Sequence, residues 1–149
     1  MRPTTLADTP VRIDADELLA RARADIGNAY PPYSKFPVAA AVLDDRGKIF
    51  TGVNVENASY GLTMCAERVA IFSAIADGAK RFHAIAVTTA SGDSVPPCGA
   101  CRQVMSEFCD PSTPVYFASG TAGPKQSTMA ALLPHAFGSS NLSATRKGD

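Results

Sequence analysis

Two short segments constrain this chain more than any other feature of its sequence. The first contains Cys65 and Glu67, and the second contains Cys98 and Cys101. Three thiolates can hold zinc and leave its fourth tetrahedral position open for water, which is the arrangement of a catalytic zinc site. We therefore predict one zinc ion per chain, held by Cys65, Cys98 and Cys101, and a fold that brings the two segments together.

Glu67 completes the chemistry that this pattern indicates. It lies two residues after the first predicted ligand, close enough to handle the proton of the metal's water, so we assign it the catalytic acid–base role. A Cys-x-Glu segment followed by Pro-Cys-x-x-Cys is similar to the signature of zinc-dependent nucleobase deaminases. Either half alone would be a weak signal, whereas the two together are a strong one.

Two structural alternatives to a catalytic site stay open at this point. The cysteines could form a disulfide, although the intervening Glu67 argues against it. A fourth ligand could instead close the zinc site, and Cys109, His83 and His135 are the candidates. Cys109 is predicted at the far end of a helix, pointing elsewhere, as a small core residue or a free surface thiol.

The composition fits one small domain spanning residues 1–149, with mobile ends at residues 1–13 and 139–149. The 14 lysines and arginines balance the 14 aspartates and glutamates, which argues against nucleic acid as the main partner. No apolar run reaches the length of a membrane span, and residues 1–9 lack the apolar stretch of a signal peptide. We therefore expect a cytoplasmic protein without membrane contact, in a reducing compartment where clustered cysteines favour metal over disulfides.

Hydrophobic periodicity predicts alternating helices and strands. Asp14 and Glu17 form a capping pattern for a first helix that continues to Tyr30. Residues 36–43 are continuously apolar, as in a strand buried on both faces, whereas residues 120–127 are too polar to predict a last strand. The other predicted elements are strands at 48–55, 84–89 and 115–118, and helices at 65–76, 99–108 and 129–133. This order predicts an α/β fold in which a mixed β-sheet lies between helices, in three layers.

The predicted helices place all three cysteines at helix starts. Helix amino ends carry partial positive charge and free N–H groups, which stabilise a thiolate over a thiol. Three thiolates around a dication leave one net negative charge, which opposes ionisation of the water. Arg68, next to Glu67, is expected to donate hydrogen bonds to the ligand sulfurs and withdraw some of that charge. A solvated surface arginine is the alternative.

A longer pattern extends from about residue 33 to residue 138. It contains the segments 32–38, 54–60, 65–68, 97–103 and 132–137. Together these segments resemble the cytidine deaminase family, in its small homotetrameric form. The Cys-Ala-Glu and Pro-Cys segments, which begin at Cys65 and Pro97, are shared with the wider deaminase superfamily, whereas the Asn-Val-Glu-Asn segment at 54–57 is narrower and points to nucleosides. Ala39 departs from the pattern, because the family commonly has glycine there.

The resemblance implies a function and an assembly. The function is zinc-dependent hydrolytic deamination of cytidine and deoxycytidine to uridine and deoxyuridine, with release of ammonia, in pyrimidine salvage. The fold is the cytidine deaminase-like α/β/α sandwich. The assembly is a homotetramer whose substrate pockets are shared between subunits, and the only other partner implied is the small-molecule nucleoside.

The resemblance also implies substrate contacts within one chain. Asn54 and Glu56 correspond to the pair that binds the ribose 3′-hydroxyl, and two residues apart on a predicted strand their side chains share one face. Without the resemblance they would be two polar residues at a solvent-facing strand end. Phe36 corresponds to the aromatic ring that packs on the pyrimidine, with a core phenylalanine as the alternative. The backbone of Ala66 corresponds to a contact with the base.

Two further residues are implied to act across a subunit boundary. Tyr60 and Phe137 resemble residues that complete the pocket of a neighbouring subunit. From the pattern alone, Tyr60 would be a loop tyrosine and Phe137 a terminal hydrophobic anchor.

Other functions remain possible from the sequence. An antibiotic nucleoside such as blasticidin S is an alternative substrate within the same chemistry. A deaminase acting on cytosine in nucleic acid would need a phosphate-binding surface, and the sequence contains no basic run longer than two residues, such as Arg146-Lys147 in the tail. A non-catalytic zinc-stabilised binding module would have no reason to keep Glu67 beside Cys65.

Overall fold

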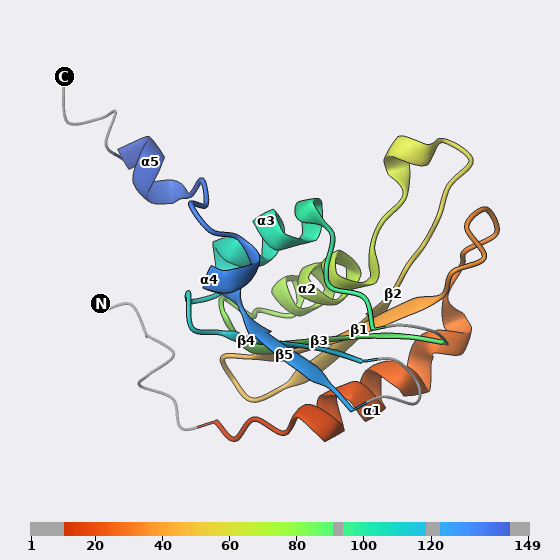
Figure 1. Cartoon of the computed structure of the whole chain (residues 1–149), viewed down its shortest axis with the longest axis horizontal. Helices are drawn as coiled ribbons and strands as arrows, with labels where there is room; N and C mark the ends of the chain where they lie inside the picture. The colour runs from red at the N-terminus through yellow and green to blue at the C-terminus, as the bar shows by residue number, and fades with distance from the viewer. Residues whose placement is uncertain (1–10, 91–93, 119–122, 144–149) are drawn as a thin grey trace.

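A five-stranded sheet forms the centre of the structure (Figure 1). Its strands lie in the order β2-β1-β3-β4-β5. β3 and β4 run parallel, and the other neighbouring pairs are antiparallel. The expected mixed sheet is therefore confirmed. The strands are β1 Val38–Asp44, β2 Ile49–Val53, β3 Phe82–Thr89, β4 Pro114–Ala118 and β5 Lys125–Thr128.

The computed structural model describes residues 11–90, 94–118 and 123–143. Most of the ends that we expect to be mobile, residues 1–13 and 139–149, thus lies outside the described residues, and so does Arg146-Lys147. Residues 139–143 form a short helix, α5 (Ser139–Ser143). Within the described ranges, the helices are all too short or too polar to cross a membrane.

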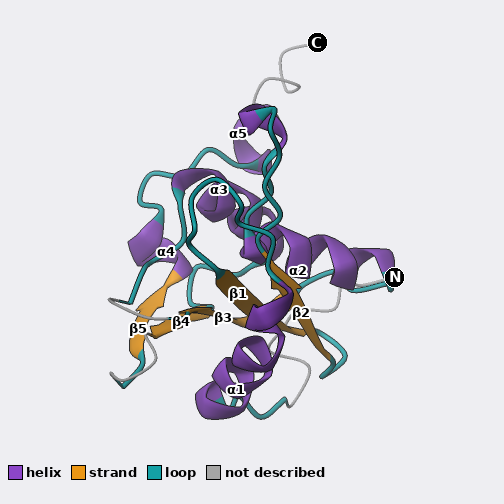
Figure 2. Cartoon of the chain, turned by 90° about the vertical axis from the view of Figure 1, so that its right-hand side faces the viewer, coloured by secondary structure: helices purple, strands orange, loops and turns teal. Residues whose placement is uncertain are grey.

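Helices cover both faces of the sheet, as Figure 2 shows. α1 (Ala15–Asp25) lies on one face. α2 (Ala66–Ala76) and α3 (Gly99–Phe108) lie on the other, with the short α4 (Met129–Leu132) beside α3. The result is the three-layer α/β/α sandwich that the sequence predicts.

The alternation of side chains along β1 explains why both faces need a helix. Ala41 and Leu43 pack in one buried cluster with Leu18 of α1. Val42, on the opposite face, packs in a second cluster with Ile71 of α2. β3 alternates in the same way, because successive strand residues point to opposite faces. The predicted strand buried on both faces is therefore confirmed.

The first helix is shorter than its periodicity predicts. Asp14 caps it as expected, accepting a hydrogen bond from the Glu17 amide at 3.1 Å. The helix ends at Asp25, and a 3₁₀ turn follows at Ile26–Asn28. Tyr30 is extended instead of helical, because its backbone pairs with the segment after β2.

The last strand, β5, forms although its residues are polar. It pairs antiparallel with β4 at the edge of the sheet, and its side chains are exposed or half-buried. An edge strand gains its stability from backbone hydrogen bonds along one side and does not require apolar side chains on both faces. Composition is therefore a poor predictor of this strand.

Candidate functional site

Two helix starts meet on one face of the sheet, and they bring the three predicted zinc ligands together. Cys65 is the N-cap residue of α2 and Cys98 is the N-cap residue of α3, each with extended backbone. Cys101 lies in the first turn of α3 and is fully buried. The sulfurs of Cys65 and Cys98 are 3.8 Å apart, and all three sulfurs lie within 4.8 Å of one another.

The sulfur spacing fits one zinc ion. With zinc–sulfur bonds of about 2.3 Å and tetrahedral angles, two ligand sulfurs should lie about 3.8 Å apart. The Cys65–Cys98 separation matches this value. Among the described residues, this is the one group of three or more His, Cys, Asp or Glu side chains that is close enough to hold a metal. Cys109, His83 and His135 do not join it, so within the described part of the chain three thiolates would hold the ion and leave its fourth position to water.

Arg68 adjusts the charge of the sulfur cluster. Its Nη2 donates to the Cys65 sulfur at 3.3 Å, so the expected contact between the guanidinium and a ligand sulfur is present. The hydrogen bond from the Cys101 thiol, assisted by Arg68, lowers the pKa of Cys65 to about 5. The same contact with Cys65, together with burial, raises the pKa of Cys101. A metal that binds all three thiolates must therefore displace the proton that Cys101 holds.

Glu67 lies in the first turn of α2, next to the sulfur cluster. Its side chain is only 4% exposed. Burial raises its pKa, and the neighbouring Cys65 thiolate acts in the same direction. A carboxyl group whose neutral form is favoured in this way is suited to carrying a proton and delivering it.

A cavity of about 240 Å³ opens beside the cluster and collects most of the predicted substrate-binding residues. Cys65, Cys98 and Glu67 belong to its wall. The other predicted residues in its wall are Phe36, Asn54, Glu56 and Ala66. None of the remaining lining residues is predicted to bind the substrate; they are Ser34, Val38, Thr63, Met64, Val87, Val95 and Pro96.

Asn54 holds the backbone that leads into β1. Its Oδ1 accepts from the Val38 amide at 2.9 Å, and its Nδ2 donates to the Phe36 carbonyl at 2.9 Å. The side chain is buried. Asn54 therefore positions Phe36 at the cavity, a role that the sequence does not reveal because the two residues lie on different segments.

Glu56 holds the preceding loop in a similar way. Its Oε1 accepts from the amides of Tyr33 and Ser34, each at 3.0 Å. Its Oε2 accepts from the Ser34 hydroxyl, which in turn accepts from the Phe36 amide at 3.1 Å. The Ser34 hydrogen bonds lower the pKa of Glu56, so it is ionised at neutral pH. Sequence alone offers no signal for the role of Ser34, since its partner is more than twenty residues away.

Tyr60 and Phe137 do not line the cavity. Tyr60 belongs to a 3₁₀ turn at Tyr60–Leu62 and is 74% exposed. Its ring packs edge to face against Tyr33, with centroids 5.7 Å apart, beside the outer end of Glu56. Phe137 is 60% exposed, and its carbonyl accepts from Gln103 of α3. One chain alone therefore leaves both rings at the surface.

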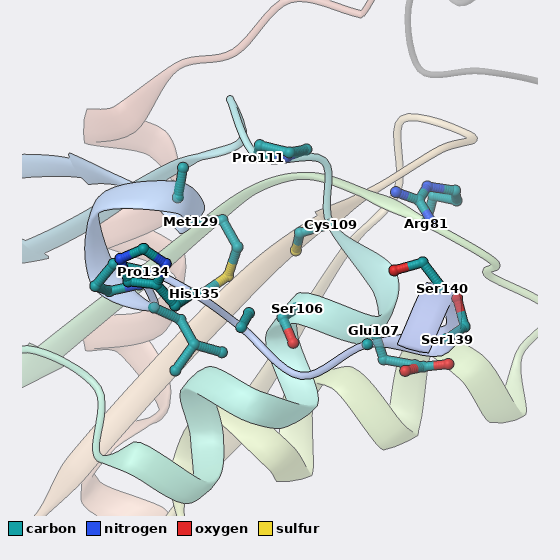
Figure 3. A pocket seen from close by; sticks show the side chains of 14 residues that line it. Arg81, Ser106, Glu107, Cys109, Pro111, Met129, Pro134, His135, Ser139 and Ser140 are labelled. Carbon is teal, nitrogen blue, oxygen red and sulfur yellow. The ribbon is translucent and has the colours of Figure 1, made fainter. Parts of the chain in front are cut away.

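A larger cavity of about 530 Å³ lies elsewhere, between α3, α4 and the start of α5. Figure 3 shows its lining, with Ser106 and Glu107 contributed by α3. Cys109 lies in this wall and is buried in the core. Burial raises the pKa of its thiol to about 12, so Cys109 is a core residue, one of the two roles predicted for it.

The comparisons with known proteins agree with this geometry. The family model described as "Cytidine and deoxycytidylate deaminase zinc-binding region" matches residues 13–117. A protein called cytidine deaminase from Sporosarcina psychrophila is 47% identical over 131 residues, which are 88% of this chain and 96% of that protein. Another with the same name from Mycobacterium tuberculosis is 38% identical over 135 residues, or 91% of this chain and 98% of that protein.

A solved structure shares the fold as well as the sequence. The crystal structure of cytidine deaminase from Burkholderia pseudomallei is 45% identical and superimposes with a TM-score of 0.79. The match covers 84% of this chain and 100% of that chain. The arrangement of sheet and helices described above is therefore also found in a related crystal structure.

Proposed function

This chain belongs to the cytidine and deoxycytidylate deaminase family, and we propose that it hydrolyses cytidine and deoxycytidine to uridine and deoxyuridine, with release of ammonia. It is a hydrolytic, zinc-dependent enzyme. The observation that carries the substrate assignment is the single cavity whose wall contains Cys65, Cys98 and Glu67 together with Asn54 and Glu56. A nucleoside carries a reactive amino carbon on its base and hydroxyl groups on its sugar, so it can use both groups of residues at once.

The chemistry divides between the metal and Glu67. A zinc ion held by the three thiolates supplies a Lewis acid that activates water near neutral pH. Glu67 accepts the proton that water loses and delivers it to ring N3, which makes C4 electrophilic. After the water oxygen bonds to C4, Glu67 takes the proton of the new hydroxyl group and delivers it to the amino group; the C4–N bond then breaks, the C4 carbonyl forms and ammonia leaves. Its burial and raised pKa support this role.

The residues around the metal support the proton transfers. Arg68, in contact with the Cys65 sulfur, withdraws negative charge from the ligands. This withdrawal favours ionisation of the attacking water, because three thiolates alone would oppose it. Cys98 and Cys65 line the cavity, so the substrate can approach the open metal position.

The lining of the same cavity supports the substrate contacts that we propose. Phe36 and Ala66 belong to its wall, and we assign the Phe36 ring to packing on the pyrimidine and the Ala66 backbone to a contact with the base. The ionised carboxylate of Glu56 accepts a hydrogen bond from the ribose 3′-hydroxyl. Asn54 lies beside it and keeps one amide hydrogen beyond the contact with Phe36.

The direct test follows the loss of cytosine ultraviolet absorbance with cytidine, deoxycytidine, blasticidin S and a cytosine-containing single-stranded oligonucleotide. We expect turnover of the first two only. Turnover of blasticidin S alone would reassign the substrate, and turnover of the oligonucleotide would indicate a nucleic-acid deaminase. A protein that holds zinc but acts on none of them would be a binding module.

We further propose a homotetramer in which Tyr60 and Phe137 complete the pockets of neighbouring subunits. The exposure of these two rings supports it, since large exposed apolar side chains mark interaction surfaces. The cavity of about 240 Å³ is also small for a nucleoside site, as expected if another subunit supplies part of the wall. Light scattering coupled to gel filtration measures the assembly, and a monomer would refute the proposal.

The proposed place of action is pyrimidine salvage in the cytoplasm. A site that depends on three free thiols is best maintained in a reducing compartment. Fractionation of the source cells, with immunodetection of the protein, tests this assignment.

A further inference from the structure

Two residues of the loop that carries Cys98 cannot donate a backbone hydrogen bond. Pro96 and Pro97 precede Cys98, and proline has no backbone N–H to donate. Cys98 itself is the most exposed of the three ligands. Besides the packing of the buried Pro97 ring, the backbone at these two prolines can be held by hydrogen bonds only through its carbonyl oxygens.

Arg102 supplies that attachment. Its Nε donates to the Pro97 carbonyl at 2.7 Å, and its backbone amide donates to the Cys98 carbonyl at 3.0 Å. The Pro97 carbonyl belongs to the peptide unit that ends at the Cys98 nitrogen, so fixing it fixes the direction in which Cys98 leaves the loop. A charged donor makes this hydrogen bond stronger than one between neutral groups.

The other side of the same guanidinium is anchored on a different segment. Nη1 of Arg102 donates to the carbonyl of Leu132, the last residue of α4, at 2.9 Å. The planar guanidinium can hold both carbonyls at once because its donors point in fixed, diverging directions. Arg102 thus clamps the metal-binding loop to the segment that follows β5.

We propose that Arg102 is a positioning residue for the zinc site, which holds Cys98 in place by clamping the Pro97 carbonyl to the end of α4. It touches neither the sulfurs nor the cavity, and it acts through the backbone of a ligand. Val95 and Pro96, on the same loop, line the cavity, so the clamp also steadies one wall of the substrate site. This inference relies on the three-cysteine zinc site of the proposed function, but not on the identity of the substrate.

Zinc release from the purified holoenzyme to an excess of a chromogenic chelator tests the proposal. Mutation of a residue that orients a metal ligand without binding the metal itself typically lowers metal affinity about 10–100-fold. We expect Arg102→Met to release zinc about 10–100-fold faster than the wild type. Arg102→Lys should lie in between, because one ammonium group cannot span both carbonyls.

Arg81→Lys is the matched control. Arg81 is also partly buried and donates to Asp110 at 2.6 Å, and it lines the other cavity, of which no sulfur of the cluster is part. Its conservative variant should release zinc at the wild-type rate. Zinc release at the wild-type rate in both Arg102 variants would overturn the proposal. Equally accelerated zinc release in Arg81→Lys would overturn it too, because it would indicate a general loosening of the fold. If Arg102→Met does not fold, the zinc-release rate of Arg102→Lys is compared with that of Arg81→Lys, and equal rates would overturn the proposal.

Elemental analysis of the wild type separates this inference from the proposed function. A wild-type protein without zinc would refute the metal site itself. A wild type with one zinc per chain and unaffected Arg102 variants would refute only the positioning role.

Discussion

Gly52→Ala is the substitution that most directly tests how the fold supports the site. Gly52 lies on β2 beneath the first turn of α2. A Cβ built on it would lie 2.4 Å from the Ala70 amide nitrogen and 2.5 Å from the Ala66 carbonyl oxygen. These two groups are the partners of one i to i+4 helical hydrogen bond, so the new methyl group would be driven into the start of the helix that carries the proposed ligand Cys65 and the proposed proton carrier Glu67.

The expected cost follows from the atoms that must move. Non-bonded carbon contacts normally lie at about 3.5 Å or more, so α2 would have to shift by about 1 Å from the sheet. Overpacking typically costs about 1–3 kcal/mol, and a weakened helical hydrogen bond adds about 1 kcal/mol. We expect a total loss of about 2–4 kcal/mol. For a chain of this size, the melting temperature should fall by roughly 6–12 °C.

The same shift should damage catalysis. Ala66, whose carbonyl takes the contact, lies between Cys65 and Glu67 in sequence. A displacement of about 1 Å in a catalytic group can cost about 100-fold in rate. We therefore expect kcat/KM for cytidine to fall by about two orders of magnitude, measured well below the melting temperature of the variant.

Thermal denaturation followed by circular dichroism, at fixed protein concentration, and the cytidine assay together measure both effects. Gly27→Ala is the control, because a Cβ at Gly27 has nothing within 4 Å, and its effect should stay within about 0.5 kcal/mol. A Gly52→Ala protein with wild-type melting temperature and activity would refute the reasoning, since it would mean that β2 and α2 are not packed backbone to backbone.

Four further predictions address the site and the stability of the fold. Cys98→Ala should lose zinc and activity together while Cys109→Ala retains both, as measured by elemental analysis; full zinc occupancy in Cys98→Ala would contradict the ligand assignment. Glu67→Gln should fold and bind zinc but lose at least about 10²–10⁴-fold in turnover, because an amide cannot carry the proton; near-normal turnover would place the proton carrier elsewhere. Glu56→Ala should cost about one to two orders of magnitude in kcat/KM for cytidine and much less for a 3′-deoxy analogue, whereas additive losses would separate Glu56 from the 3′-hydroxyl. Burial lowers the pKa of His83, so the unfolded chain binds the proton more readily than the folded chain. The free energy of unfolding should therefore decrease as the pH falls below about 6.5. Chemical denaturation at several pH values should show that this free energy depends less on pH in His83→Gln.

The sequence by itself determines the chemistry and the local elements that present it. Cys65, Glu67, Cys98 and Cys101 are recognisable because zinc chemistry requires those residue types at short spacings. The predicted helix at 99–108 coincides with α3. Such a helix can be predicted because its start, its end and its apolar face depend on residues that are neighbours along the chain. The three-layer fold also follows, since alternation of helices with apolar strands leaves few other ways to bury both faces of a sheet.

Only the tertiary structure decides which distant residues meet. It brings the Cys65 sulfur to 3.8 Å from the Cys98 sulfur, and it commits the amide of Asn54 to the backbone of another segment. It also forms β5 from polar residues and places Arg102 between two carbonyls thirty or more positions apart. The physical reason is the same in each case. These hydrogen bonds and sulfur contacts depend on distances between segments that are set by the packing of the helices on the sheet, and residue type alone does not specify those distances.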